Sequence, residues 1–150
     1  MKHWIGPALV GILVRVASLF PMDPLCQRDE CQYLDLAKQV AAGEMLGMAG
    51  EASGRFWLWA PGYPYLLGAT EWLTGDAEWF KLVQVLSFPV LAWLGWLVAG
   101  KGSAGRMTAW LLALHPTLAY FAGHIWSETV YVTLLFALLA ALGWSRKGGA

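Results

Sequence analysis

The sequence predicts an all-α integral membrane protein, with about four transmembrane helices and two amphipathic helices in its first external loop. Hydrophobic residues make up 58% of the 150 residues and charged residues only 13%, whereas a soluble domain carries about a quarter charged residues. The apolar residues gather in long runs, and the chain has ten tryptophans, a residue that favours membrane interfaces. A surrounding bilayer explains this composition better than one small soluble core.

Four apolar runs are the expected spans, and they cover residues 4–20, 79–100, 103–122 and 125–144. About 20 helical residues cross the roughly 30 Å of bilayer hydrocarbon. Helices are expected because backbone amides in lipid must be paired within the segment or in a closed barrel, and barrel-like alternation is absent. His115-Pro116 predicts a kink or break in the third run. Residues 1–150 are expected to form a single membrane domain.

The first run also resembles a signal peptide, because Lys2 precedes an apolar stretch. Arg15 interrupts that stretch and no small-residue cleavage site follows, which favours an uncleaved helix. An ionisable residue inside a span is itself a functional candidate. Arg15 lies five residues before Phe20, so it could reach the outer interface and meet Asp29 or a phosphate there. Snorkelling alone explains its position equally well.

The placement of basic residues predicts the orientation. Five of them fall on one side of a four-span arrangement: Lys2, Lys101, Arg106, Arg146 and Lys147. The positive-inside rule puts that side in the cytoplasm, with both termini, and leaves Lys81 as an exception. Residues 21–80 hold nine acidic residues against three basic ones, a formal charge of −6. We therefore expect a multi-pass protein of the cytoplasmic (inner) membrane with loop 21–78 outside.

Two helices are expected in this external loop. Apolar residues recur at helical spacing from Tyr33 to Val40, which predicts an amphipathic surface helix over 29–42 that Gly43 ends. A second helix, over 62–74, follows Pro61 and ends at Gly75. It is too short to cross the bilayer. Four aromatic residues would seat it in the interface: Trp57, Trp59, Tyr63 and Tyr65.

Cysteine and charge patterns limit the function classes. Cys26 and Cys31 could form a disulfide in an oxidising compartment. Two unlinked thiols are the favoured interpretation, because a helical Cys31 would be poorly placed for the bond. No basic run or basic-aromatic stripe indicates a nucleic-acid partner.

Asp29 and Glu30 open the first loop helix and are the candidate catalytic pair. Asp29 and Tyr33 are four residues apart and would share a helix face. Adjacent carboxylates at the external membrane surface could have perturbed pKa values, which would suit a general base. Acidic residues are also favoured in any first helical turn, and from spacing alone this second explanation is preferred.

His124 and Glu128 form a second candidate group, near the external end of the fourth predicted span. They are four residues apart, which would place them on one face of a shared helix. Together with Asp29 they could bind a divalent metal, but no dense ligand motif supports one. No metal site and no cofactor is therefore predicted.

Several short motifs follow one another in the order found in a known family. They are Asp29-Glu30-x-x-Tyr33, Leu36-Ala37, Gly43, Ala60-Pro61-Gly62-Tyr63-Pro64, Val83-Gln84, His115-Pro116 and Ser127-Glu128-Thr129. The chain resembles the N-terminal part of the multi-spanning (C-type) polyprenyl-phosphate-sugar-dependent glycosyltransferases, which include protein O-mannosyltransferases and lipid A aminoarabinose transferases. Some members place a lysine before the proline of the second loop motif, where this chain has Trp59-Ala60-Pro61.

The resemblance implies an activity. A sugar would pass from a polyprenyl phosphate to an acceptor at the outer membrane face, with inversion at the anomeric carbon. Asp29 matches the family's acidic residue in the first external loop, where it would activate or orient the acceptor hydroxyl, with Glu30 beside it. The candidate substrate-binding residues are Arg15, Tyr33, His124 and Glu128. The expected partners are the lipid-linked sugar donor and membrane lipids.

Members of this family have more spans than this chain. It is therefore expected to be the N-terminal part of a longer fold, to work with a partner that supplies the missing helices, or to have lost catalysis. The alternative, from another class, is a small non-catalytic membrane protein that serves as a subunit, a scaffold or an inactive remnant. A transporter fragment is less favoured, because the charged residues cluster at one mouth and not along a midplane path.

Overall fold

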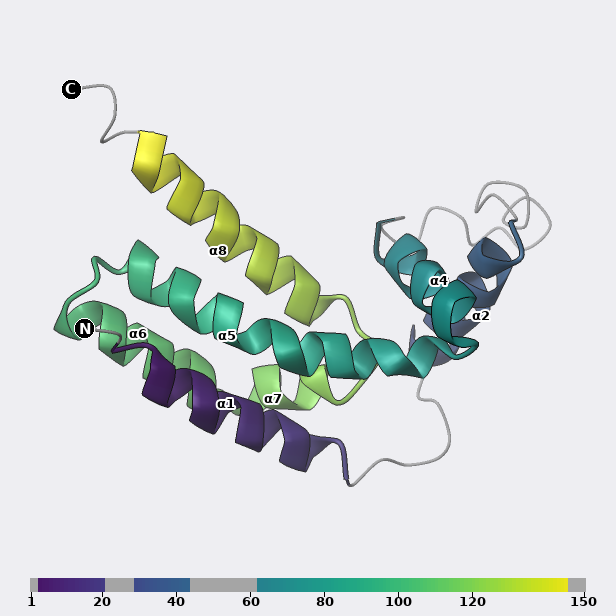
Figure 1. The fold of residues 1–150 in the computed structure, drawn as a ribbon, viewed down its shortest axis with the longest axis horizontal. Coiled ribbons are helices and arrows are strands. Elements are labelled where there is room, and N and C mark those ends of the chain that lie inside the picture. Colours follow the sequence, from purple (N-terminus) through teal and green to yellow (C-terminus); the bar gives the residue numbers. More distant parts are fainter. Residues whose placement is uncertain (1–2, 21–28, 44–61, 146–150) are drawn as a thin grey trace. The chain divides into compact units, whose positions relative to one another are not determined.

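The computed structural model describes residues 3–20, 29–43 and 62–145, and Figure 1 shows their fold. This part of the chain is helical and contains no strand, which confirms the predicted all-α class. It divides into two compact units, one formed by Met1–Met22 with Val83–Ala150 and the other by Asp23–Leu82. We call them the long-helix unit and the loop unit.

The long-helix unit contains the four predicted apolar runs. Its helices are α1 (Ile5–Ser18), α5 (Phe80–Val98, whose first turn belongs to the loop unit), α6 (Ser103–Leu114), α7 (Pro116–Ala122) and α8 (Glu128–Ser145). Within the described residues, Ala77–Val98 is the one helix long and apolar enough to cross a membrane by length and composition. Ile5–Ser18 and Glu128–Trp144 are shorter apolar helices.

The third apolar run contains a break at the predicted position. His115 has an extended backbone, with φ −68° and ψ 113°, between the end of α6 and the start of α7. Proline disfavours a helical conformation in the residue before it and brings no N–H of its own. The N–H of Leu118 donates to His115 Nδ1 at 3.4 Å, which caps α7. The break leaves carbonyls at the end of α6 without helical donors.

Small residues allow the helices of this unit to pack closely. Its core consists of Ala8 from α1, Phe88, Leu91 and Ala92 from α5, and Ala109 and Ala113 from α6. Gly11 makes room for Phe88 against α1, because a side chain at this glycine would overlap the ring. Small residues at such contacts let helix backbones approach one another.

The loop unit pairs α2 (Asp29–Ala41) with α4 (Gly62–Thr74), followed by the 3₁₀ turn η1 (Ala77–Trp79). Both α helices match the predicted ranges 29–42 and 62–74 closely. Gly43 and Gly75 follow the two helices with φ of +82° and +79°, a left-handed conformation that glycine adopts without steric cost and that commonly ends helices. The two predicted stop signals are therefore confirmed.

One predicted interfacial anchor has a different position. Tyr63 is buried, and its ring packs edge-on against Tyr33 at 4.8 Å and against Phe80 at 5.6 Å between ring centroids. It therefore holds α4 to its neighbours. The exposed apolar surface of α4 is instead formed by Tyr65, Leu66, Trp72 and Leu73. Trp57 and Trp59 lie outside the described residues.

Candidate functional site

The loop unit contains an ion pair in which both side chains are buried. Glu30 Oε1 lies 3.0 Å from Lys81 Nζ, with side-chain exposures of 6% and 10%. Glu78 Oε2 lies 3.6 Å from the same ammonium and is 55% exposed. Lys81 departs from the positive-inside pattern in sequence, and these two carboxylates neutralise its charge. Its unusual position was the sequence signal for this pair.

The two candidate catalytic acids occupy different environments. Both stand in the first turn of α2, but Glu30 turns inward to Lys81 whereas Asp29 is only partly buried. Within the described residues, the structure shows no hydrogen bond or ion pair from the Asp29 side chain. Glu30 thus joins α2 to the start of α5, whereas Asp29 takes no part in this contact.

Tyr33 lies one turn after these acids and is buried. Its ring contacts Tyr63, and Tyr63 in turn contacts Phe80, which neighbours Lys81 in the chain. The aromatic rings and the ion pair therefore hold the same three elements together. This packing explains the burial of Tyr33 without a substrate.

Cys31, also in the first turn of α2, is disulfide-bonded. The preferred expectation of two unlinked thiols is therefore wrong. Cys26 is the only other cysteine of the chain and lies outside the described residues. Disulfides persist in oxidising compartments and are rare in the cytosol.

Arg15 is only 1% exposed and lies inside the long-helix unit. Its Nη1 donates to the carbonyl oxygens of Gly11 at 3.1 Å and Ala113 at 3.2 Å, and its Nη2 donates to that of Leu112 at 3.1 Å. The guanidinium carbon lies 3.7 Å from the centroid of the Phe88 ring, a cation–π contact. These contacts hold the charge within the unit, not at an interface.

The partners of Arg15 follow from the break at His115. In a continuous helix the carbonyl of Leu112 would accept from the N–H of residue 116, which is proline. Arg15 supplies the missing donor. Nearby, Ser18 Oγ donates to the Ala119 carbonyl at 2.9 Å and so ties α1 to α7. We therefore interpret Arg15 as a structural donor, in place of the snorkelling or phosphate-binding roles expected from sequence.

His124 and Glu128 do not share a helix face, which corrects the sequence-based expectation. His124 lies in the turn after α7, and Glu128 is the first residue of α8. The His124 carbonyl accepts from Gln84 Nε2 at 2.7 Å, and its ring packs on Tyr120 with centroids 4.4 Å apart. Sequence reasoning did not identify the role of Gln84, which is 1% exposed and anchors this turn to α5.

The structure thus groups Glu30 and Tyr33 in the loop unit, with Asp29 beside them. Arg15, His124 and Glu128 belong to the long-helix unit. Across residues 3–20, 29–43 and 62–145, no three His, Cys, Asp or Glu side chains gather as a metal site requires.

No protein family, curated protein or solved structure matches this chain. A functional assignment therefore depends on the residues and contacts described above.

The first prediction concerns Arg15. Arg15→Met should destabilise the protein by about 3 kcal/mol or more, because buried carbonyls left without a donor cost about 1–3 kcal/mol each. Arg106→Met removes an exposed arginine and should change stability by less than about 0.5 kcal/mol. The measurement is unfolding of the purified protein in mild detergent. Equal stability of the two variants would contradict the donor role.

The second prediction separates the two acids. Glu30→Gln should cost about 3 kcal/mol, near the lower limit for breaking a buried pair, because Glu78 still contacts Lys81. Asp29→Asn should cost less than about 0.5 kcal/mol. The double variant Glu30→Gln/Lys81→Met should regain most of the loss, since no buried charge remains. The same unfolding assay tests all three variants, and a large loss in Asp29→Asn would show that Asp29 is also structural.

Proposed function

We propose that this chain is a membrane glycosyltransferase, or a fragment of one, that transfers a sugar from a polyprenyl-phosphate-linked donor to an acceptor at the outer membrane face. The observation that carries the proposal is that the two acids in the first turn of α2 differ in their contacts. Glu30 is bound to Lys81, whereas Asp29, the acid that matches the family motif, has no structural partner among the described residues. A carboxylate that is not committed to an ion pair suits a general base.

The polarity of the long-helix unit supports a membrane location. Arg15, Gln84 and Thr129 are buried, while large apolar side chains cover the outside. Exposed examples include Leu13, Met107, Leu111, Leu134 and Leu138. A soluble protein places polar residues outside and rarely buries an arginine. A helix that is apolar all round, as α8 is, belongs in a large core or in lipid.

The disulfide and the charges support the orientation. Cys31 is disulfide-bonded, which indicates an oxidising compartment for the loop unit. Lys101 in the turn between α5 and α6 and Arg106 in the first turn of α6 are exposed, as expected at a cytoplasmic helix connection. We therefore propose that the loop unit faces outward from the cytoplasmic membrane and that both termini are cytoplasmic.

The proposed reaction is a single displacement. The Asp29 carboxylate accepts the proton of the acceptor hydroxyl as its oxygen attacks the anomeric carbon of the donor sugar. The bond from that carbon to the phosphate oxygen breaks on the opposite face, polyprenyl phosphate leaves, and the configuration inverts. The substrate-binding roles of Tyr33 in the loop unit, and of His124 and Glu128 in the long-helix unit, stay predictions.

A non-catalytic membrane scaffold is the second candidate. The observation that favours it is that most polar residues singled out in the sequence serve architecture: Arg15 pairs with carbonyls, Glu30 pairs with Lys81, and Tyr33 is packed. The two candidates differ in what Asp29 does. Loss of transfer on its substitution supports the enzyme, and normal transfer supports the scaffold.

The third prediction tests orientation with cysteines at two exposed positions. Asp35→Cys on α2 should react with a membrane-impermeant maleimide in intact, unreduced cells, because the loop unit faces outward. Ser103→Cys at the start of α6 should react only after the membrane is permeabilised. Each variant is labelled under both conditions as its own control. Reaction at position 103 but not at position 35 in intact cells would show that the orientation is opposite to the one proposed.

The fourth prediction tests catalysis. Asp29→Asn should lower the rate of transfer from a lipid-linked sugar at least about a hundredfold, since general-base assistance is worth roughly 10²–10⁴-fold. Glu30→Gln should lower the amount of folded protein and leave the rate per folded molecule closer to normal. The assay uses native membranes, with the level of each variant measured. An unchanged rate in Asp29→Asn would remove Asp29 from the mechanism.

A further inference from the structure

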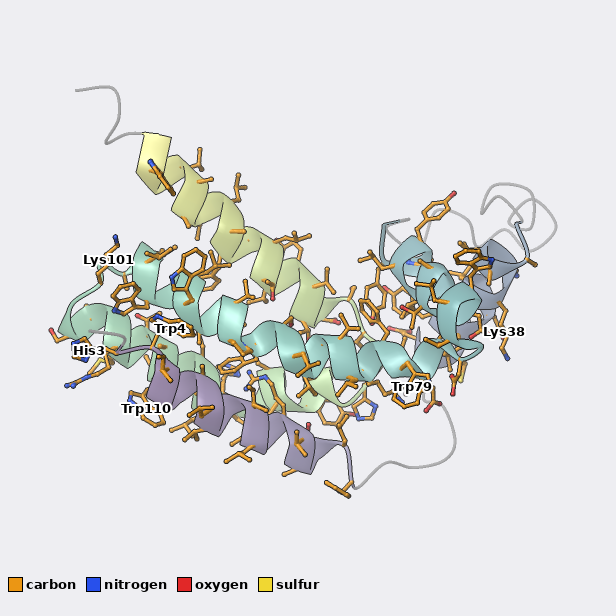
Figure 2. All side chains as sticks on the ribbon, viewed as in Figure 1. His3, Trp4, Lys38, Trp79, Lys101 and Trp110 are labelled. Carbon is orange, nitrogen blue, oxygen red and sulfur yellow. The ribbon has the colours of Figure 1, made fainter. Side chains whose placement is uncertain are left out.

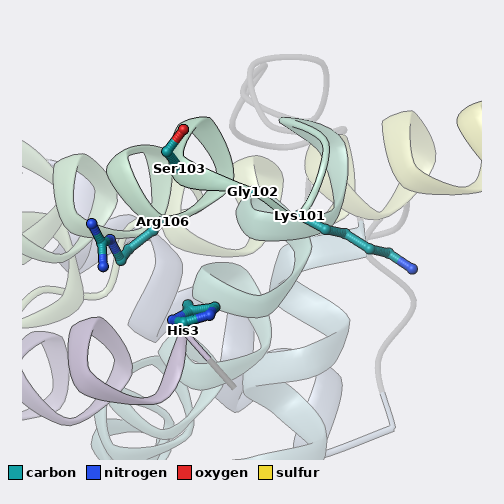
Figure 3. A pocket seen from close by; sticks show the side chains of 5 residues that line it. All are labelled: His3, Lys101, Gly102, Ser103 and Arg106. Atoms are coloured by element: carbon teal, nitrogen blue, oxygen red, sulfur yellow. The ribbon is translucent and has the colours of Figure 1, made fainter. Parts of the chain in front are cut away.

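A basic pocket lies at one end of the long-helix unit, and none of the residues assigned to the proposed reaction lines it. It is lined by His3, Lys101, Gly102, Ser103 and Arg106 and has a volume of about 260 Å³. The lining comes from two separate segments, His3 before α1 and the turn from α5 into the first turn of α6 (Figure 3). His3 and Arg106 lie on one side of this turn, and the Lys101 side chain extends away from them.

None of the described residues of its unit neutralises the positive charge of this pocket. No acidic residue occurs in residues 3–20 or 83–127, and no ion pair of Lys101 or Arg106 is found within the described chain. All five lining residues are exposed. An anion from outside the protein would therefore find two cationic side chains and further hydrogen-bond donors.

The surroundings of the pocket indicate which anion it meets. Figure 2 shows Trp4 and Trp110 at the same end of the unit as His3 and Lys101. Lys101 Nζ lies 5.9 Å from the centroid of the Trp96 ring. Tryptophan together with basic residues is typical of the head-group layer of a membrane. Beyond this layer, α6 exposes Met107 and Leu111, at 66% and 65%, where acyl chains would lie.

We propose that this pocket binds the phosphate of an anionic phospholipid in the cytoplasmic leaflet. Arg106 contacts the phosphate, Lys101 adds positive charge on the other side of the turn, and Met107 and Leu111 lie along the acyl chains. The exposed apolar side chains of Met107 and Leu111, which follow Arg106 along α6, are the reason to prefer a lipid over free phosphate. This inference depends on the membrane location proposed above and not on sugar transfer, so its failure would leave the test of Asp29 unaffected.

The test measures lipid binding to the purified full chain in neutral detergent by native mass spectrometry. Phosphatidylglycerol should bind at least about tenfold more tightly than phosphatidylcholine, given the contribution of each basic residue near an anionic surface. Lys101→Gln/Arg106→Gln should abolish that preference. Lys38→Gln removes an exposed lysine from α2 and should leave the preference intact.

Three outcomes would overturn the proposal: equal binding of the two lipids, an equal loss of preference in Lys38→Gln, or complete displacement of phosphatidylglycerol by equimolar inorganic phosphate. The last would assign the pocket to free phosphate. Circular dichroism checks that each variant keeps its helical content. If the double variant does not fold, the single variant Arg106→Gln is measured in its place. If Arg106→Gln keeps the full preference for phosphatidylglycerol, the proposed site is wrong.

Discussion

An unpaired backbone carbonyl in an apolar interior is the constraint on which the long-helix unit depends. Pro116 ends α6 and removes the N–H that would have reached the Leu112 carbonyl. Water cannot replace that donor in a packed, apolar environment. Arg15 solves the problem from α1, with bonds to Leu112 and Ala113. The broken helix and the buried arginine therefore require each other, because each alone would leave a polar group unpaired.

This mutual requirement also organises the surrounding core. Gly11 accepts one bond from Arg15 through its carbonyl and, by lacking a side chain, admits the Phe88 ring beneath the guanidinium. Phe88 belongs to α5, so three helices meet around one charged group. Ser18 then ties the end of α1 to the Ala119 carbonyl of α7. The polar contacts of Arg15 and Gln84 lie inside this unit, while many of its large apolar side chains are exposed.

The loop unit handles its own buried charge with a partner of opposite sign. Lys81 is held by Glu30 and approached by Glu78. Of the two neighbouring acids in α2, Glu30 is thereby used for folding, whereas Asp29 pairs with no described residue. Sequence spacing could not reveal this difference between Asp29 and Glu30, because both acids stand in the first turn of the same helix. From spacing alone, two acids that simply favour a first helical turn were therefore the preferred explanation.

Local signals in the sequence determined the helical class and most helix boundaries. Gly43, Gly75 and Pro116 act on the backbone of their immediate neighbours, so their effects can be read without the rest of the fold. Apolar runs likewise predicted where α1, α5 and α8 lie. The placement of His124 and Glu128 on one helix face was wrong, because a run of apolar residues does not mark a turn held by Gln84 from another helix.

Only the tertiary structure decided what the charged and aromatic residues do. Arg15 and Ala113 are 98 residues apart, and Glu30 meets Lys81 from a different element. No periodicity along the chain records such distant contacts. Tyrosine is a residue type that often anchors helices in the membrane interface, yet the neighbouring rings of Tyr33 and Phe80 bury Tyr63. Residue type sets which interactions are possible, and three-dimensional packing selects the ones that form.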